Sequence, residues 1–127
     1  GGLEFTLDSY DKFGISMASL GSVSDGVIVI AVGAYGDDDG GSDAGAVYVL
    51  CLNSTGVVTS HQKLSNSYGG LEFTLDSYDK FGISMASLGS VSDGVIVIAV
   101  GAYGDDDGGS DAGAVYVLCL NSTGVVT

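Results

Sequence analysis

The side chains that could do chemistry in this chain gather in one acidic loop, which occurs twice. The loop reads Gly-Asp-Asp-Asp-Gly-Gly-Ser-Asp from residue 36 and returns unchanged from residue 104. Alternate carboxylates could form part of an oxygen cage for calcium, which takes about six to eight oxygen ligands. The alternative is a solvated turn whose charge keeps the chain soluble. The candidate calcium ligands are Asp37, Asp39, Asp43, Asp105, Asp107 and Asp111.

Two further turns carry the N-x-[ST] pattern that accepts an N-linked glycan. Asn53-Ser54-Thr55 and its copy at 121–123 each precede a glycine, and an acceptor asparagine must lie in an exposed turn. Asn53 and Asn121 are therefore candidate glycosylation sites. The alternative is a tight turn of Asn, Ser, Thr and Gly that carries no glycan.

Residues that could support catalysis are few. His61 is the only histidine, and it has no serine or cysteine partner at a recognisable spacing. Cys51 and Cys119 lie inside apolar runs at equivalent positions, where a small buried thiol is the expected state. We therefore predict no catalytic residues and expect a protein that is not an enzyme.

The composition narrows the class of protein. The chain of 127 residues has 22 glycines and no proline, and its net charge is -13. Such a charge repels phosphate backbones and anionic lipids, so binding to nucleic acid is not expected. No apolar run approaches the roughly 20 residues of a membrane span, so membrane insertion is not expected either. A chain with this much glycine is also unsuited to a helical bundle.

The elements that position these loops read as strands. We expect strands at Phe13–Leu20, Val27–Val32, Ala46–Leu52 and Val57–Leu64 in the first half of the chain, and no helix. The second of these, Val-Ile-Val-Ile-Ala-Val, has the pattern of a strand buried on both faces. The fourth carries polar residues, as an edge strand does, and its Lys63 would keep that edge from pairing with other chains.

Residues 1–59 recur without a change as residues 69–127, and residues 60–68 occur once. We therefore divide the chain into a first repeat, 1–68, and a second repeat, 69–127, which is truncated in its last strand. Four strands per repeat favour an all-β protein made of propeller-type blades in tandem. Two such blades leave two apolar faces bare, so neighbouring chains or a longer array are expected to cover them.

Three short motifs in order carry a resemblance to a known family. They are Asp-Lys-Phe-Gly-Ile-Ser at 11–16, Val-Gly-Ala-Tyr at 32–35 and Gly-Ala-Val-Tyr-Val at 45–49, and all return in the second repeat. They resemble the FG-GAP repeat, the blade of the integrin α-chain propeller and of many extracellular proteins. Tyr35 stands where that family has proline. The family's calcium loop between the first two strands is not matched, because only Asp25 of its acids is present.

This resemblance implies an extracellular or cell-surface protein with a structural or adhesive role. Its expected partners are copies of itself, joined through blade-to-blade β packing into a filament or ring, and extracellular matrix or glycan. One alternative is an engineered or evolution-model propeller fragment that closes into a ring and has no native function. Another is a calcium-dependent propeller that binds a ligand or glycan.

Overall fold

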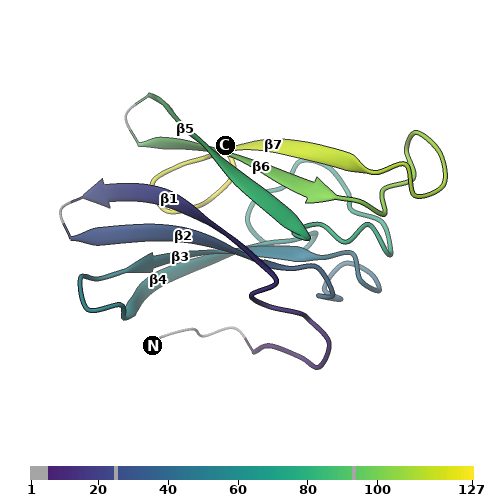
Figure 1. Cartoon of the computed structure of the whole chain (residues 1–127), viewed down its shortest axis with the longest axis horizontal. Helices are drawn as coiled ribbons and strands as arrows, with labels where there is room; N and C mark the ends of the chain where they lie inside the picture. The colour runs from purple at the N-terminus through teal and green to yellow at the C-terminus, as the bar shows by residue number, and fades with distance from the viewer. Residues whose placement is uncertain (1–5, 25, 93) are drawn as a thin grey trace.

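The computed structural model describes residues 6–24, 26–92 and 94–127, and these form strands and loops without a helix. The first sheet has the order β1 (Ser16–Ser24), β2 (Val27–Ala34), β3 (Ala46–Leu52) and β4 (Val58–Leu64). The second sheet has the order β5 (Ser84–Ser92), β6 (Val95–Ala102) and β7 (Ala114–Leu120). Both are antiparallel meanders (Figure 1). The all-β prediction is confirmed, and the four-stranded and three-stranded sheets are consistent with blade-like units.

The first strand differs from its predicted range, and the reason is local backbone geometry. Phe13 was expected to open it, but β1 begins at Ser16 and continues to Ser24. Lys12 and Gly14 have positive φ angles of 61° and 93°, which are incompatible with a strand. At the other end, the pairing with β2 shifts at Gly21, whose φ is 86°. This bulge lets the strand run on beyond Leu20, where we expected it to end.

The two sheets pack face to face and share one apolar core. The first strands of the two sheets, β1 and β5, lie side by side, and Figure 1 shows one sheet above the other. The first sheet contributes odd-numbered residues of β2 and β3, and the second sheet contributes even-numbered residues of β6 and β7, as the alternation of a strand requires. The core includes Val29, Ala31, Val47, Val49, Ile98, Val100, Leu118 and Leu120.

Identical residues of the two repeats therefore have different surroundings. Val47 and Val49 face the second sheet and are 0% and 1% exposed. Their copies Val115 and Val117 point away from the first sheet and are 69% and 62% exposed. The face of the second sheet that carries Val115 and Val117 is therefore exposed, whereas the equivalent face of the first sheet is buried against the second sheet.

The opposite relation holds on the outer face of the first sheet. Ile28 and Met17 are 46% and 66% exposed there, whereas Ile96 is 7% exposed and Met85 packs against the shared core. A smaller cluster on this face, closed in part by Phe13, is made of Val32, Ala34, Ala46, Tyr48 and Leu50. The prediction that Val27–Val32 is buried on both faces therefore fails at Ile28.

We predict that the same substitution has opposite consequences in the two repeats. Val49→Asp should lower the free energy of unfolding by about 3 kcal/mol or more, because it places an unpaired charge between the sheets. Val117→Asp should cost less than about 1 kcal/mol in a dilute sample, because its side chain meets solvent. Urea unfolding at low protein concentration measures both. Equal losses would show that the sheets do not pack through this face of β3.

Candidate functional site

The acidic loop of the first repeat follows β2 and is organised around Asp37. The carboxylate of Asp37 is buried, with 3% of its side chain exposed. Its Oδ1 accepts the N–H of Asp39 at 3.0 Å, the local bond by which aspartate favours a turn. The backbone N–H of Asp37 donates to the carbonyl of Ala34 at 3.1 Å, and so ties the loop to the end of β2. Asp37 is therefore held rigidly below the loop surface.

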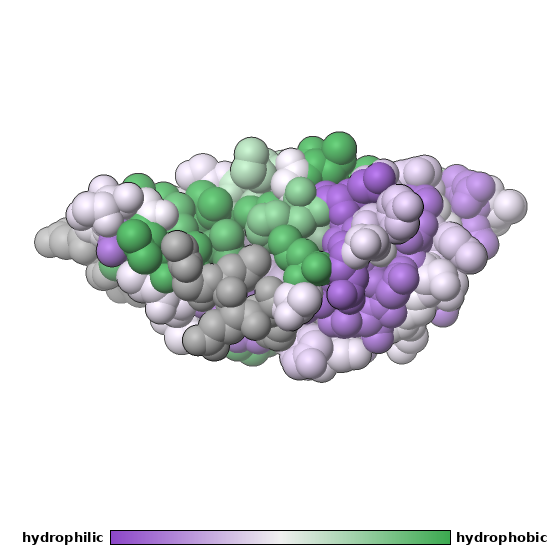
Figure 2. All heavy atoms as spheres, turned by 90° about the horizontal axis from the view of Figure 1, so that it is seen from below, coloured by the Kyte–Doolittle hydropathy of each residue, from purple (hydrophilic) through white to green (hydrophobic). Residues whose placement is uncertain are grey.

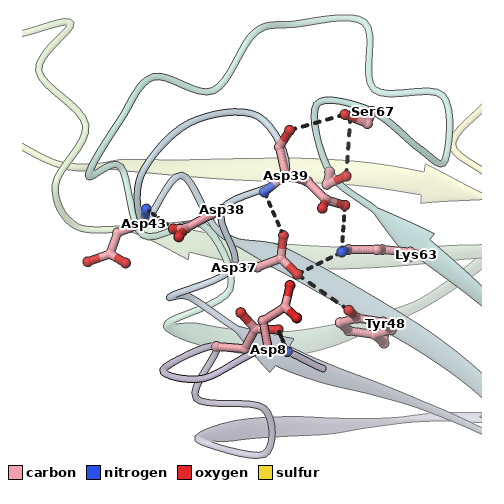
Figure 3. Close-up of polar contacts among 10 residues, drawn as sticks. Asp8, Asp37, Asp38, Asp39, Asp43, Tyr48, Lys63 and Ser67 are labelled. Atoms are coloured by element: carbon pink, nitrogen blue, oxygen red, sulfur yellow. Dashed lines mark hydrogen bonds and ion pairs between the residues drawn. The ribbon is translucent and has the colours of Figure 1, made fainter. Parts of the chain in front are cut away.

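Lys63 of β4 supplies the charge that balances this carboxylate (Figure 3). Its Nζ lies 2.7 Å from Asp37 Oδ2 and 2.5 Å from Asp39 Oδ2. The register of β3 and β4 pairs Lys63 with Tyr48, and the ammonium lies 5.3 Å from the centroid of the Tyr48 ring. The Tyr48 hydroxyl donates to Asp37 Oδ2 at 3.4 Å. Three elements thus meet in one buried polar cluster, which we call the lysine cluster: Asp37, Asp39, Tyr48 and Lys63.

Burial and charge act in opposite directions on the lysine. Desolvation disfavours the ammonium, but its hydrogen bonds to Asp37 and Asp39 outweigh that effect and hold the pKa of Lys63 above its ordinary value. Burial raises the pKa of Tyr48 to about 12, although Lys63 opposes the shift. Both groups therefore keep their protons at neutral pH, and the cluster is a structural ion pair.

The same loop in the second repeat has a different charge balance. The Tyr116 hydroxyl donates to Asp105 Oδ2 at 2.7 Å, and the N–H of Asp107 donates to Asp105 Oδ1 at 2.9 Å. Among the described residues, no lysine pairs with Asp105 or Asp107. Burial raises the pKa of Tyr116, and its bond to Asp105 raises it further. The same loop sequence therefore has its negative charge balanced by a lysine in the first repeat and left unbalanced in the second.

A further buried aspartate lies next to each loop. Burial raises the pKa of Asp79, and the negative charge of Asp105 adds to that rise. Burial likewise raises the pKa of Asp11 next to Asp37, but there the charge of Lys63 lowers it in part. Each aspartate accepts a backbone N–H at 2.8 Å, from Asp76 and Asp8 respectively, so each is needed to shape its turn.

The six candidate calcium ligands do not all converge. Asp37 and Asp39 meet at Lys63, whereas the N–H of Asp43 donates to Asp38 Oδ1 at 2.8 Å and its carboxylate lies 3.5 Å from Lys80 Nζ. Asp111 repeats this turn with a 2.6 Å bond to Asp106, apart from Asp105 and Asp107. Within the described ranges, no group of three or more acidic, histidine or cysteine side chains is arranged to hold a metal. Calcium at these loops stays a prediction, and Asp25 lies outside the described residues.

Both candidate glycosylation sites form tight turns. The side-chain oxygen of Asn53 accepts the N–H and hydroxyl of Thr55 at 2.9 and 2.7 Å, and Asn121 makes the same bonds with Thr123. The residues between them are exposed, so a glycan at either asparagine stays a prediction. Cys51 is a free, buried thiol as expected, and Cys119 is free and half-buried.

Sequence reasoning missed the role of Lys63. We expected an exposed lysine on an edge strand, but Lys63 is 4% exposed and lies within the lysine cluster. The available signal was charge balance, because the chain has three cationic side chains against 16 acidic ones. Lys63 also lies within residues 60–68, the segment without a copy in the second repeat.

A second polar arrangement joins the two repeats, and we call it the seam. The segment 78–82 of the second repeat lies along residues 42–45 of the first and forms an isolated parallel bridge between Gly45 and Phe81. The backbone N–H groups of Tyr78, Lys80 and Phe81 donate across the seam at 2.7 to 3.0 Å. Polar backbone bonds therefore flank the apolar contact between the sheets.

Comparison with known proteins identifies no relative. No model of a protein family matches the chain, and no curated protein matches it. The resemblance to the FG-GAP repeat therefore stays a hypothesis that rests on the three motifs.

We predict that Lys63→Met lowers the free energy of unfolding by about 3 kcal/mol, because it leaves the buried Asp37 without its cationic partner. Lys80→Met is the matched control, since its ion pair with Asp43 is longer and more exposed. It should cost less than about 1 kcal/mol. Urea unfolding compares the two variants. A loss as small for Lys63→Met as for Lys80→Met would contradict the structural importance of the lysine cluster.

We also predict a pH-dependent gain from Asp79→Asn. A raised folded-state pKa means that stability is lost as pH rises from the ordinary aspartate value of 3.8 through the folded-state value. Asparagine removes this penalty and can still accept the N–H of Asp76. The variant should therefore melt a few degrees higher than the native chain at pH 7, with no gain below pH 3.8.

Asp11→Asn is the control for that measurement. Lys63 already offsets part of the shift at Asp11, so thermal melts should show a smaller gain for this variant. A larger gain from Asp11→Asn than from Asp79→Asn would contradict the difference in charge balance between the two repeats.

Proposed function

We propose that this protein is a structural repeat module that assembles with copies of itself through blade-to-blade β packing. The bare face of the second sheet in one copy would cover the outer face of the first sheet in the next. Such a head-to-tail contact closes into a ring if the rotation per copy divides a full turn, and otherwise grows as a filament.

One observation carries the proposal: the bare face of the second sheet and the partly exposed outer face of the first sheet are copies of the two faces that join inside the chain. Val115 and Val117 repeat Val47 and Val49, which are covered within the chain. At the other end, Ile28 repeats Ile96, which is covered as well. A contact that is stable once in the chain is therefore available a second time between chains.

The magnitude of apolar burial supports this association. Covering a valine contributes about 1.5–3 kcal/mol when it goes from full exposure to full burial. Val115 and Val117 together would therefore contribute roughly 3 kcal/mol, and other residues of the same faces would add to it. This gain opposes the entropy lost when two copies associate.

The distribution of polar groups is compatible with such a stack. Figure 2 shows apolar residues over one half of a face of the molecule and hydrophilic residues gathered at its other end. The net charge of -13 disfavours association at low salt. We therefore expect assembly to strengthen as salt is added.

The wider setting follows from the resemblance alone. We propose an extracellular or cell-surface module with a structural or adhesive role, in keeping with FG-GAP proteins. Calcium at the acidic loops and glycans at Asn53 and Asn121 are further proposals, which rest on the residues of those turns rather than on the resemblance. The part of the chain that the structure describes contains no helix that could cross a lipid bilayer.

We predict that sedimentation velocity shows assembly of the native chain with rising concentration, and that Val117→Asp abolishes it. The substituted charge would be buried without a partner in the contact between copies. Ser54→Asp is the control, because it adds the same charge at an exposed position whose copy, Ser122, stays exposed where the two sheets join inside the chain, and it should leave assembly unchanged. A discrete particle would indicate a closed ring, and an open size distribution a filament. A native chain that stays monomeric throughout would refute the proposal.

A further inference from the structure

We propose that a groove at the bare end of the second sheet binds residues 10–14 of a second copy of this chain. The bond would be made mainly by backbone groups, in the manner of the seam inside the chain. This docking rests on the self-assembly proposed above and names the residues that would direct it.

The seam supplies the template for the docked state. The N–H groups of Tyr78, Lys80 and Phe81 donate to the carbonyl oxygens of Ser42, Asp43 and Ala44 at 2.7, 3.0 and 3.0 Å. In return, the hydroxyl of Ser16 donates to the carbonyl of Gly82 at 2.6 Å. The segment 78–82 is thus bound by four hydrogen bonds that need no particular side chain on its own part.

Glycines make this close approach possible. A Cβ atom at Gly33 would overlap the carbonyl oxygen of Gly82, and one at Gly45 would overlap the backbone of Phe81. Gly33 has an ordinary φ, so its lack of a side chain is explained by this approach of the neighbouring backbone rather than by its own conformation.

The second repeat presents the same receptor without an occupant from this chain. A groove of about 450 Å³ lies against Ser84, Gly101, Tyr103, Ala112, Gly113 and Val115. These are the copies of residues that line the seam in the first repeat. Among the described residues, the carbonyl groups of Ser110, Asp111 and Ala112 accept no backbone hydrogen bond. They correspond to the three acceptors of the seam.

The matching ligand is the segment 10–14, which is the copy of 78–82. Its backbone has the docked shape already, because the φ angles of Tyr10, Lys12 and Gly14 are 72°, 61° and 93°. The corresponding angles in the seam are 70°, 60° and 95°. A 3.0 Å bond from the N–H of Gly14 to the carbonyl of Gly33 anchors this shape, as the bond from Gly82 to Gly101 does in the seam. Little conformational entropy would be lost on docking.

The segment is also accessible. Tyr10 is 79% exposed and Lys12 is exposed. Within the described part of the chain, the N–H groups of Tyr10, Lys12 and Phe13 donate no hydrogen bond. These are the three donors that the template requires.

The lysine of the segment adds a charged contact. In the seam, Lys80 Nζ lies 5.8 Å from the ring centroid of Tyr35 and 3.5 Å from Asp43. By the same placement, Lys12 of a second copy would meet Tyr103 and Asp111. This contact joins Lys12 of one copy to Asp111 of the next, so it favours head-to-tail over head-to-head association.

The test is a double variant that fills the groove while leaving the single chain intact. A Cβ at Gly101 would overlap only the hydroxyl of Ser84 and would lie 3.6 Å from the Ser84 Cβ, an ordinary contact. Ser84→Ala/Gly101→Ala therefore fits the isolated chain, whose circular dichroism spectrum should not change. In the docked state the new methyl group would overlap the carbonyl of Gly14 from the second copy, as a methyl group at Gly33 would overlap Gly82 in the seam.

Sedimentation at a series of concentrations gives the expected result in numbers. Ser84→Ala alone, the matched control, loses one hydrogen bond and should weaken self-association roughly fivefold. The double variant should weaken it more than about thirtyfold, because it also excludes the docked backbone. In the assembled native chain, the amides of Tyr10, Lys12 and Phe13 should exchange their hydrogens more slowly than in the dilute chain.

Each contrary outcome has a distinct meaning. A native chain that never assembles would overturn both the proposed function and this docking site. Assembly of the double variant at native strength would overturn the docking site alone. So would slowed exchange in β7 without any change at Tyr10, Lys12 and Phe13, because that pattern would indicate pairing through the edge of the sheet.

Discussion

The structure depends on one constraint: both faces of its sheets are apolar, and an apolar face must be covered. Between the two sheets, the constraint is met where odd-numbered residues of the first sheet pack against even-numbered residues of the second. The strands of the two repeats carry the same side chains, so the sequence does not decide which face of a sheet is exposed. Exposure depends instead on whether another sheet packs against that face, as Val49 and Val117 show.

The glycine-lined seam belongs to the same constraint. Apolar contact alone is non-directional and would allow the two sheets to slide or rotate. The backbone bonds from Tyr78, Lys80 and Phe81 fix the register between the repeats, because they form only where Gly33 and Gly45 let the backbone come close. The seam thus gives direction to a contact whose free energy comes mainly from burial.

Much of the fold could be predicted from the sequence, and the failures have physical causes. β3 has its predicted bounds, and β2 begins as predicted and ends at Ala34, two residues beyond its predicted end. Long β-branched runs define buried strands well. β1 was misplaced since positive φ angles at Lys12 and a bulge at Gly21 depend on contacts that periodicity does not record. Lys63 was misassigned because its partners, Asp37 and Asp39, are brought to it by pairing between β3 and β4. The composition identified the acidic loop itself. Only the fold shows that its aspartates pair with two different lysines, Lys63 and Lys80.

The unrepeated residues 60–68 make two identical repeats chemically unequal. Lys63 compensates Asp37 and Asp39, and it also lowers the pKa of Asp11 in part, whereas Asp79 next to Asp105 has no such relief. Because charge repulsion acts over about 8–10 Å at moderate ionic strength, the uncompensated cluster affects what can approach the bare end of the second sheet. A second copy docked there, as proposed, would bring Lys12 toward that acidic end. Apolar burial, backbone pairing and charge then favour the same head-to-tail direction, and agreement among independent interactions is what makes a single arrangement stable over its alternatives.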